Sequence, residues 1–291
     1  ECFSGDTELL TDKGFVRFDN LKQNELVAQY NDDGTINYVK PLRYIQNEVN
    51  EYVSFKYKDI EIKTTKNHNM VFIQSDGKIK TRPAHEYLTN VLLEDKFITE
   101  AKINIDEEQK LTDYQRVCIM LQADGCLYHK GKYEDTYKLE FSKQRKIDKS
   151  IELLEKAKIP YKVYEHKRIF ENTKWQPSTK ITFKMPKQEN KYKILTDFLE
   201  QPKNSTYARD ILEEIMNWDA YVRHDGTTEY DSVVKENVDF VRLCAFLCGT
   251  KCSHILKIAR KKENHNTIYR VCFDKKINWH YNRFTKELIK K

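Results

Sequence analysis

The sequence lacks the features of a membrane-spanning or exported protein. No stretch of its 291 residues comes near the roughly 20 apolar residues that cross a bilayer. Its first residues, ECFSGDTELL, contain no basic and apolar leader. The seven cysteines are odd in number and scattered, without the spacing of a disulfide framework. We therefore expect a cytoplasmic protein with reduced thiols.

The composition is that of a folded protein. Aromatic residues make up 12% of the chain and hydrophobic residues 39%, which is too apolar for a disordered segment. A length of 291 residues favours two compact domains over one. The richness in Lys, Asn, Ile and Tyr is compatible with an AT-rich genome, such as that of a phage.

The net charge of +6 is unevenly distributed along the chain. Residues 1–108 contain 14 Lys and Arg and 20 Asp and Glu, a net charge of −6. Subtraction from the totals of 51 and 45 leaves 37 basic and 25 acidic residues in 109–291, a net charge of +12. This separation is typical of a polyanion-binding domain fused to an acidic processing domain. A generally Lys-rich surface is the simpler alternative.

Residues 1–108 show the alternation of apolar and polar side chains that predicts short β-strands. The alternating stretches are FVRF, NELVAQY, INYVKPL and EYVSFKY. Turn signals that end in Gly14, Gly34 and Gly77 separate them. We expect a β-rich first domain over residues 1–108.

Residues 109–291 change to a longer period and divide into two similar halves, about 109–190 and 203–291. Each half reads as a helix, two strands, a second helix and two more strands. The helical prediction depends on apolar side chains three and four residues apart, such as Ile147, Ile151 and Leu154. The sequence therefore predicts a duplicated αββαββ domain of the α/β (α+β) class.

The front of the chain carries a nucleophile and a TxxH motif. Cys2 opens CFSGDTELL, and Thr65 and His68 lie in KTTKNHNMVF nearly sixty residues later. These stretches resemble the first conserved blocks of inteins, which belong to the Hint fold. The resemblance continues through GKIKTRPAHEYLTNVLLEDKFITEA.

The resemblance implies an autocatalytic rearrangement at the peptide bond before Cys2. The Cys2 thiol would attack the carbonyl of Glu1 to form a thioester, because a thiol is the better nucleophile near neutral pH. His68 would donate a proton to the departing amide nitrogen. Thr65 would hydrogen-bond to the same peptide unit. No cofactor is expected for this reaction, and its partner is the host protein in cis.

An intein closes with a His-Asn pair before the next host residue, and no such pair follows Lys291. The alternatives are a truncated chain, a complementary carboxy-terminal segment on another chain, or further residues after Lys291. We expect that residues 1–291 alone begin the splicing reaction without completing it.

Two acidic residues follow apolar helices at matching places in the two halves. VCIMLQADG contains Asp124, and LEEIMNWDA contains Asp219. The first stretch is similar to the signature of the LAGLIDADG homing endonucleases. The resemblance implies a monomeric nuclease whose paired helices present both carboxylates to Mg²⁺ ions, which activate water for cleavage of each DNA strand. The strands of both halves would read double-stranded DNA in the major groove.

The second motif departs from the signature. Glu213, Glu214 and Trp218 are larger than the residues that usually let the two helices approach. Family members also use a basic residue near the metals, for which Lys203 is our candidate and Lys143 a weaker one, although each could be an ordinary solvated lysine. The leading hypothesis is an intein-encoded, site-specific endonuclease fused to a splicing half. The alternative is an autoprocessing module with an inactive DNA-binding remnant.

Overall fold

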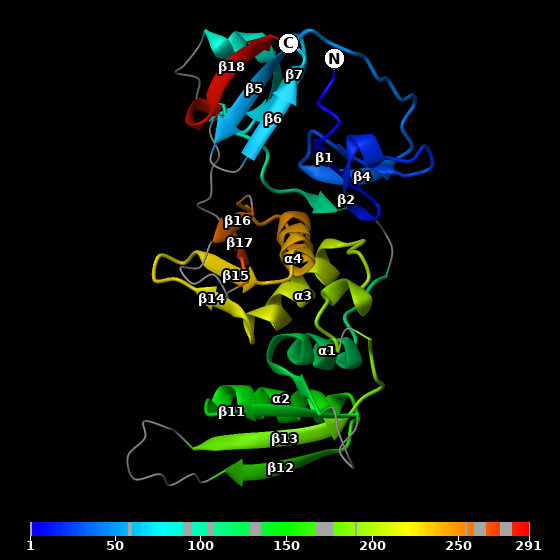
Figure 1. Cartoon of the computed structure of the whole chain (residues 1–291), viewed down its shortest axis with the longest axis vertical. Helices are drawn as coiled ribbons and strands as arrows, with labels where there is room; N and C mark the ends of the chain where they lie inside the picture. Colours follow the sequence, from blue (N-terminus) through cyan, green and yellow to red (C-terminus); the bar gives the residue numbers. More distant parts are fainter. Residues whose placement is uncertain are drawn as a thin grey trace.

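A computed structural model describes residues 2–57, 60–89, 95–103, 108–128, 135–166, 177–189, 191–253, 255–258, 266–273 and 281–290. The molecule is elongated, with a strand-rich first domain at one end and the two helix-containing halves stacked beyond it (Figure 1). Within the described ranges, every helix is too short or too polar to cross a membrane.

The first domain contains three small sheets, as its alternating sequence predicted. A five-stranded sheet has the order β2-β1-β3-β4-β9 and is antiparallel apart from the β4–β9 pair. Its strands are β1 (Glu8–Thr11), β2 (Gly14–Arg17), β3 (Val27–Tyr30), β4 (Thr35–Val39) and β9 (Lys102–Ile103). The other strands are β5 (Glu51–Tyr57), β6 (Ile60–Thr64), β7 (Asn69–Ile73), β8 (Ile79–Pro83) and β18 (Thr285–Lys290), with 3₁₀ turns η1 (Phe18–Asn20), η2 (Ala84–Leu88) and η5 (Tyr281–Arg283). Gly14 and Gly34 have φ of 104° and 82° at two predicted turns, a conformation that glycine adopts without strain.

The last strand belongs to the first domain. This differs from the sequence-based expectation, which assigned all of residues 203–291 to the second half of the second domain. β18 pairs with β5 along its whole length, and β5 pairs with β6 on its other side. Tyr281 stacks on Phe97 and Tyr87, with ring centroids 3.9 and 4.5 Å apart, and its hydroxyl donates to the carbonyl of Val71 at 3.0 Å. Figure 1 shows this red strand beside β5. The second domain is therefore inserted into the first.

The two halves of the second domain have the same topology. Their sheets have the orders β10-β11-β13-β12 and β14-β15-β17-β16, and all pairs are antiparallel. The first half consists of α1 (Asp113–Asp124), β10 (Cys126–Leu127), β11 (Thr136–Phe141), α2 (Gln144–Lys156), β12 (Tyr161–His166) and β13 (Ser178–Lys184). The second consists of α3 (Ser205–Met216), β14 (Ala220–Val222), β15 (Thr228–Ser232), α4 (Lys235–Leu247), β16 (Leu256–Ile258) and β17 (Ile268–Phe273). The 3₁₀ turn η4 (Leu195–Asp197) lies between the halves. The predicted αββαββ repeat is therefore present.

Local sequence signals fix the starts of α1 and α3. Thr112 and Gln115 form a capping box at α1, and the Asn204 side chain accepts from the Tyr207 amide at α3. The residues of α1 from Val117 to Leu121 are all fully buried, because this helix is surrounded by the rest of its domain. Both helices thus begin at defined residues, which determines where their acidic ends lie.

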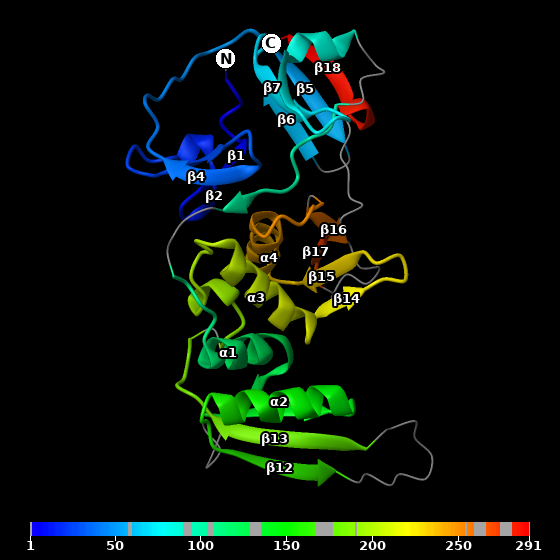
Figure 2. The ribbon, with the colours of Figure 1, turned by 180° about the vertical axis from the view of Figure 1, so that it is seen from behind.

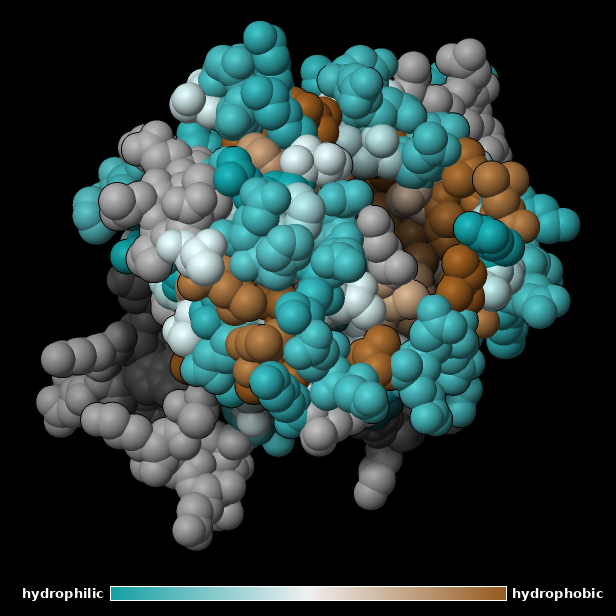
Figure 3. All heavy atoms as spheres, turned by 90° about the horizontal axis from the view of Figure 1, so that it is seen from above, coloured by the Kyte–Doolittle hydropathy of each residue, from teal (hydrophilic) through white to brown (hydrophobic). Residues whose placement is uncertain are grey.

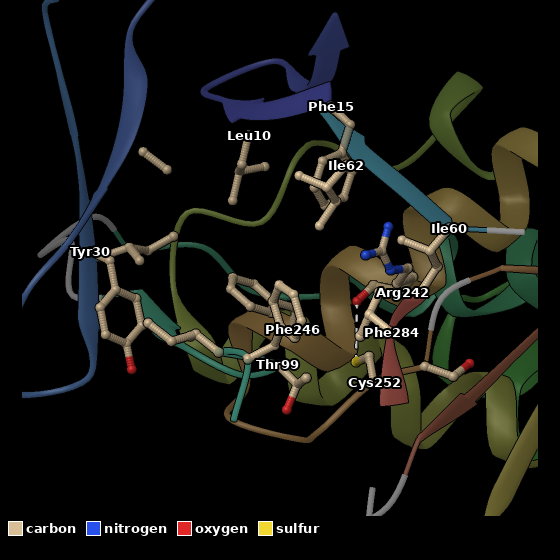
Figure 4. Close-up of a pocket in the computed structure, with 15 residues that line it drawn as sticks. Leu10, Phe15, Tyr30, Ile60, Ile62, Thr99, Arg242, Phe246, Cys252 and Phe284 are labelled. Carbon is tan, nitrogen blue, oxygen red and sulfur yellow. Dashed lines mark hydrogen bonds between the residues drawn. The ribbon is translucent and has the colours of Figure 1, made fainter. Parts of the chain in front are cut away.

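The domains meet mainly along α4 (Figure 2). The amide of Ala101 donates to the Phe246 carbonyl at 2.9 Å, and the Arg242 guanidinium lies 5.2 Å from the centre of the Phe15 ring. A cavity of about 350 Å³ lies beside this contact, with Leu10, Phe15, Ile62 and Phe246 among its lining residues (Figure 4). Seen from the end that carries the first domain, apolar residues gather around a hollow in a mainly hydrophilic surface (Figure 3).

Candidate functional site

The helices α1 and α3 contact each other through a charged cluster. Arg116 of α1 donates to Glu214 of α3 at 3.1 Å and lies 3.7 Å from Asp210. The other oxygen of Glu214 accepts from the Trp218 indole at 3.0 Å. Glu214 is 1% exposed, so its charge needs these partners. Two of the three large residues that departed from the expected motif, Glu214 and Trp218, are accommodated by this cluster.

The acidic residues at the ends of these two helices come near each other. Asp124 is the last residue of α1, and Asp219 follows α3, with its amide donating to the Ile215 carbonyl at 3.3 Å. Burial, together with the nearby charge of Asp124, raises the pKa of Asp219 to about 6. Lys146 and Lys193 oppose this shift. Two carboxylates from topologically equivalent positions therefore share one electrostatic environment.

Lys146 on α2 connects the two helix ends. Its ammonium donates to Asp124 at 2.5 Å, and it lies 5.8 Å from the centre of the Trp218 ring, beside Asp219. The neighbouring Arg145 donates to the Asn217 carbonyl at 3.0 Å. The start of α2 in the first half thus contacts the end of α3 in the second.

Lys193 lies beneath the same site, in the segment between the halves. Its ammonium donates to the carbonyls of Leu121, Gln122 and Gly125 at 3.2, 3.0 and 2.8 Å. A cation suits this position because the last carbonyls of a helix carry partial negative charge. Burial lowers the pKa of Lys193, while the nearby acids oppose that shift.

The backbone around Lys193 is held in place by α4. The buried Asn237 side chain donates to the Lys193 carbonyl at 2.8 Å and accepts from the Leu195 amide at 2.9 Å. The two preceding residues, Lys191 and Tyr192, have φ of 52° and 59°, which is uncommon for residues other than glycine. This constrained turn directs Lys193 toward the end of α1.

The structure does not place Lys203 at this site. Lys203 immediately precedes the cap of α3, whereas Asp219 follows its last turn. Twelve helical residues at about 1.5 Å each separate these ends by roughly 18 Å. Lys143 is the N-cap residue of α2, one turn before Lys146. Sequence reasoning missed Lys146 and Lys193 because the fold, rather than the spacing, brings them to the acids. Lys143 stays a weaker candidate, because no contact between its side chain and the two acids supports it among the described residues.

The donor set suits a hard divalent cation. Carboxylate oxygens are the ligands that Mg²⁺ and Mn²⁺ prefer. Asp219 is half-buried beside the charge of Asp124, an arrangement that a nearby divalent cation would relieve. The side chain of Asp124 is 27% exposed, so the site is open to solvent. Asp124 and Asp219 would hold the metal.

A second cluster forms at the front of the first domain. The Cys2 amide donates to the Thr65 hydroxyl at 3.0 Å, and the Thr65 amide donates to the Cys2 carbonyl at 2.9 Å. The His68 ring lies 4.1 Å from the ring of Phe3, and its amide donates to the Thr65 carbonyl at 3.0 Å. The structure thus brings Cys2, Thr65 and His68 together. Glu1 lies outside the described residues.

One relative in sequence covers nearly the whole chain. No family model matches. The chain is 27% identical over 308 residues to ribonucleoside-diphosphate reductase subunit beta of Aquifex aeolicus strain VF5, a match that covers 93% of this chain and 43% of that protein. The chain therefore spans less than half the length of this relative.

Several solved structures are similar to part of this chain. The N-terminal LAGLIDADG domain of DUF199/WhiA has 12% identity and a TM-score of 0.38, covering 60% of this chain and 80% of its own. I-DmoI in complex with DNA and Mn has 13% identity and a TM-score of 0.37, covering 56% and 89%. Mesophilic variants of the homing endonuclease I-DmoI have 11% identity and a TM-score of 0.38, covering 57% and 85%.

Proposed function

We propose that the second domain is a metal-dependent nuclease that cuts double-stranded DNA at a specific site. The observation that carries the proposal is the meeting of Asp124 and Asp219 at the ends of two neighbouring helices, one from each αββαββ half. Paired acids in a repeated fold give one carboxylate for each strand of a duplex. The basic excess of residues 109–291 supports DNA as the partner.

The residues around the acids have distinct roles in this reaction. A bound divalent cation, Mg²⁺ in our proposal, would supply an activated water and stabilise the leaving oxygen of the phosphodiester. Asp124 and Asp219 hold the cation. Lys146 supplies a positive charge at the rim of the site, where it can stabilise charge on the phosphate. Lys193 is a positioning residue, because its donors are already directed at the end of α1.

Cleavage of the uninterrupted host gene tests the nuclease. We expect the protein to cut this DNA with Mg²⁺ or Mn²⁺ and to lose the activity in EDTA. Asp124→Asn and Asp219→Asn should each reduce the rate by at least about a hundredfold, because each removes a ligand charge without changing volume. If the wild-type protein fails to cut, or if both Asn variants cut at the same rate as the wild type, the nuclease proposal is wrong.

A host for the element is suggested by the sequence relative. Almost all of this chain aligns with less than half of a ribonucleoside-diphosphate reductase subunit beta. This fits an intein carried within such a subunit, whose uninterrupted gene would be the DNA target. The reductase activity itself is not carried over to residues 1–291. On this proposal the protein acts as a cytoplasmic monomer.

We infer a second activity at the front of the first domain, the rearrangement that begins protein splicing. The hydrogen bond from the Cys2 amide to the Thr65 hydroxyl favours it, because this amide belongs to the peptide bond that would break. The Cys2 thiol would lose its proton to solvent as its sulfur bonds to the Glu1 carbonyl carbon and the carbon–nitrogen bond breaks. The amide nitrogen takes a proton from His68 and becomes the Cys2 amine, leaving a thioester.

Thiol-induced cleavage tests this second activity. A chain with a host leader before Cys2 should release that leader in dithiothreitol, because the added thiol exchanges with the thioester. Cys2→Ala should stop the release, and His68→Ala should slow it. The absence of thiol-induced release from the wild-type chain would contradict the proposal.

An inactive second domain is the alternative to a nuclease. A remnant of this kind would bind duplex DNA in a salt-sensitive manner without cutting it. Such an outcome, together with thiol-induced release at Cys2, would favour an autoprocessing module. Its proposed partners are the host protein in cis and a complementary carboxy-terminal segment.

A further inference from the structure

The outward face of the first-half sheet is basic. Along β11 and β13 the odd-numbered residues Leu139, Phe141, Ile181 and Phe183 are buried, so the even-numbered side chains face the other way. The charged residues on this outward face are four lysines and one glutamate: Lys138, Lys162, Lys180, Lys184 and Glu140.

Lys162 and Lys184 form no ion pair with a carboxylate among the described residues, whereas Lys138 lies 3.3 Å from Glu140. Lys180 lies opposite Glu140 in the paired strands and interacts with it electrostatically, without an ion pair. The Lys180 ammonium lies 5.1 Å from the centre of the Tyr128 ring and 5.8 Å from that of Tyr164. Aromatic faces favour the charged form of such an ammonium, so Lys162, Lys180 and Lys184 can each contact an anion.

The equivalent face of the second-half sheet is electrically balanced over the residues that the structure describes. In β15 and β17, Tyr230 and Val271 are fully buried, and their neighbours Glu229, Asp231 and Arg270 face outward. Arg223, just beyond β14, lies beside Glu229. Two carboxylates thus stand against two guanidinium groups.

The guanidinium of Arg270 is fully engaged by these carboxylates. Its Nε and Nη2 donate to the two oxygens of Asp231, each at 2.7 Å, and its Nη1 lies 3.1 Å from Glu229. Arg223 lies 3.2 Å from the other oxygen of Glu229. A bidentate pair of this kind is among the stronger charged contacts in proteins, and a phosphate would have to displace it.

We propose that the two sheets share a DNA duplex unequally, with the first-half sheet anchoring the phosphates and the second-half sheet contributing little to phosphate binding. This inference rests on the proposed binding of double-stranded DNA. Lys162, Lys180 and Lys184 can release counterions from the duplex, whereas Glu229 and Asp231 already neutralise Arg270 and repel phosphate. The sheets thus have one topology and different electrostatic roles.

Salt-dependent binding of the full chain to a 30-base-pair duplex of arbitrary sequence, in EDTA to prevent cleavage, tests the proposal. Each lysine that contacts a phosphate adds about 0.9 to the slope of log affinity against log salt. Lys180→Gln with Lys184→Gln should therefore reduce the slope by about 1.8 and the affinity roughly tenfold. Arg270→Gln should change the slope by less than about 0.5, and the control Lys78→Gln in the first domain should leave it unchanged.

Removing a negative charge from the second-half sheet should change DNA affinity in the opposite direction. Glu229→Gln keeps the shape of the side chain and removes one negative charge beside Arg270 and Arg223. It should increase affinity for the duplex about two- to fivefold and steepen the slope. Circular dichroism would show that each variant is folded.

The outcomes separate this inference from the proposed function. If the wild-type protein does not bind duplex DNA in a salt-sensitive manner, the proposed function fails. If it binds, but Arg270→Gln lowers the slope as much as one lysine does or Glu229→Gln weakens binding, only the unequal division is overturned.

Discussion

The two αββαββ halves have the same strand order, but their acidic residues lie in different surroundings. The charge of Asp124 in the first half is not buried without a partner, because Lys146 pairs with it at 2.5 Å and solvent reaches it. Asp219 of the second half is more enclosed, and its pKa is raised to about 6. A duplicated topology therefore fixes where the acids lie without fixing how deeply each is enclosed.

The same contrast extends to the sheet surfaces. The first-half sheet presents four lysines beside one glutamate, and the second-half sheet presents Arg270 bound by Asp231 and Glu229. The halves share a buried pattern because each must form a core, whereas their exposed residues are free to diverge. Changes at equivalent positions should consequently have unequal effects.

The largest expected effect comes from Lys146, which links the first-half acid to the second-half helix end. Lys146→Met should reduce DNA cleavage by about a hundredfold or more, because it removes positive charge beside the reacting phosphate. Single-turnover cleavage with Mg²⁺ measures the effect. Lys149→Met, on the same helix, is the matched control and should retain activity. Equal losses in both variants would contradict the assigned role.

Arg116 tests how the halves are joined. Arg116→Met leaves the buried carboxylate of Glu214 without its cation, which should lower the free energy of unfolding by about 3 kcal/mol. Urea denaturation measures the change. Adding Glu214→Gln should recover most of the loss, since the neutral amide can still accept from Trp218. A double variant as unstable as the single one would show that shape, rather than charge, holds the helices together.

Asp219 should make stability depend on pH in an unusual direction. Its pKa in the folded protein is raised to about 6, above the ordinary value of 3.8, so the folded state binds its proton more tightly than the unfolded state does. This contribution stabilises the protein below about pH 4 and is lost as pH rises through about 6. With allowance for partial exposure, the loss should be about 2 kcal/mol.

The variant Asp219→Asn isolates that contribution. In EDTA at pH 7 it should be about 2 kcal/mol more stable than the wild type, and the difference should disappear near pH 4. Asp124→Asn should show a smaller gain in stability. It removes the charge of Asp124, which is only the second cause of the raised pKa of Asp219, and it also loses the ion pair with Lys146. Equal stabilities of wild type and Asp219→Asn at both pH values would show that Asp219 ionises normally.

The repeated fold could be predicted from sequence because its signals are local. Helical spacing of Ile147, Ile151 and Leu154 identified α2, and the order of elements gave the αββαββ repeat. The acids were found for the same reason, since Asp124 and Asp219 each follow an apolar helix at a matching position.

The lysines and the last strand could not be found in this way. Lys146 and Lys193 reach the end of α1 only after α2 and the segment between the halves have packed. Lys203 was chosen by nearness in sequence to α3, but the length of that helix carries Asp219 away from it. β18 alternates like any strand, and nothing local in it specifies β5 as its partner.

The smallest effect should come from the residues that follow the two acids, Gly125 in the first half and Ala220 in the second. A Cβ added at Gly125 would lie 2.6 Å from both the carbonyl oxygen and Cδ2 of Leu121, so this helix end must shift to accept it. Gly125→Ala should cost about 1 kcal/mol in urea denaturation. Ala220→Gly should cost about 0.5 kcal/mol, mainly through backbone entropy, because the Ala220 methyl group is only partly buried. If Gly125→Ala does not change the free energy of unfolding, the close contact with Leu121 at the end of α1 is absent in solution. The ends of α1 and α3 would then tolerate the same small side chain after the acid.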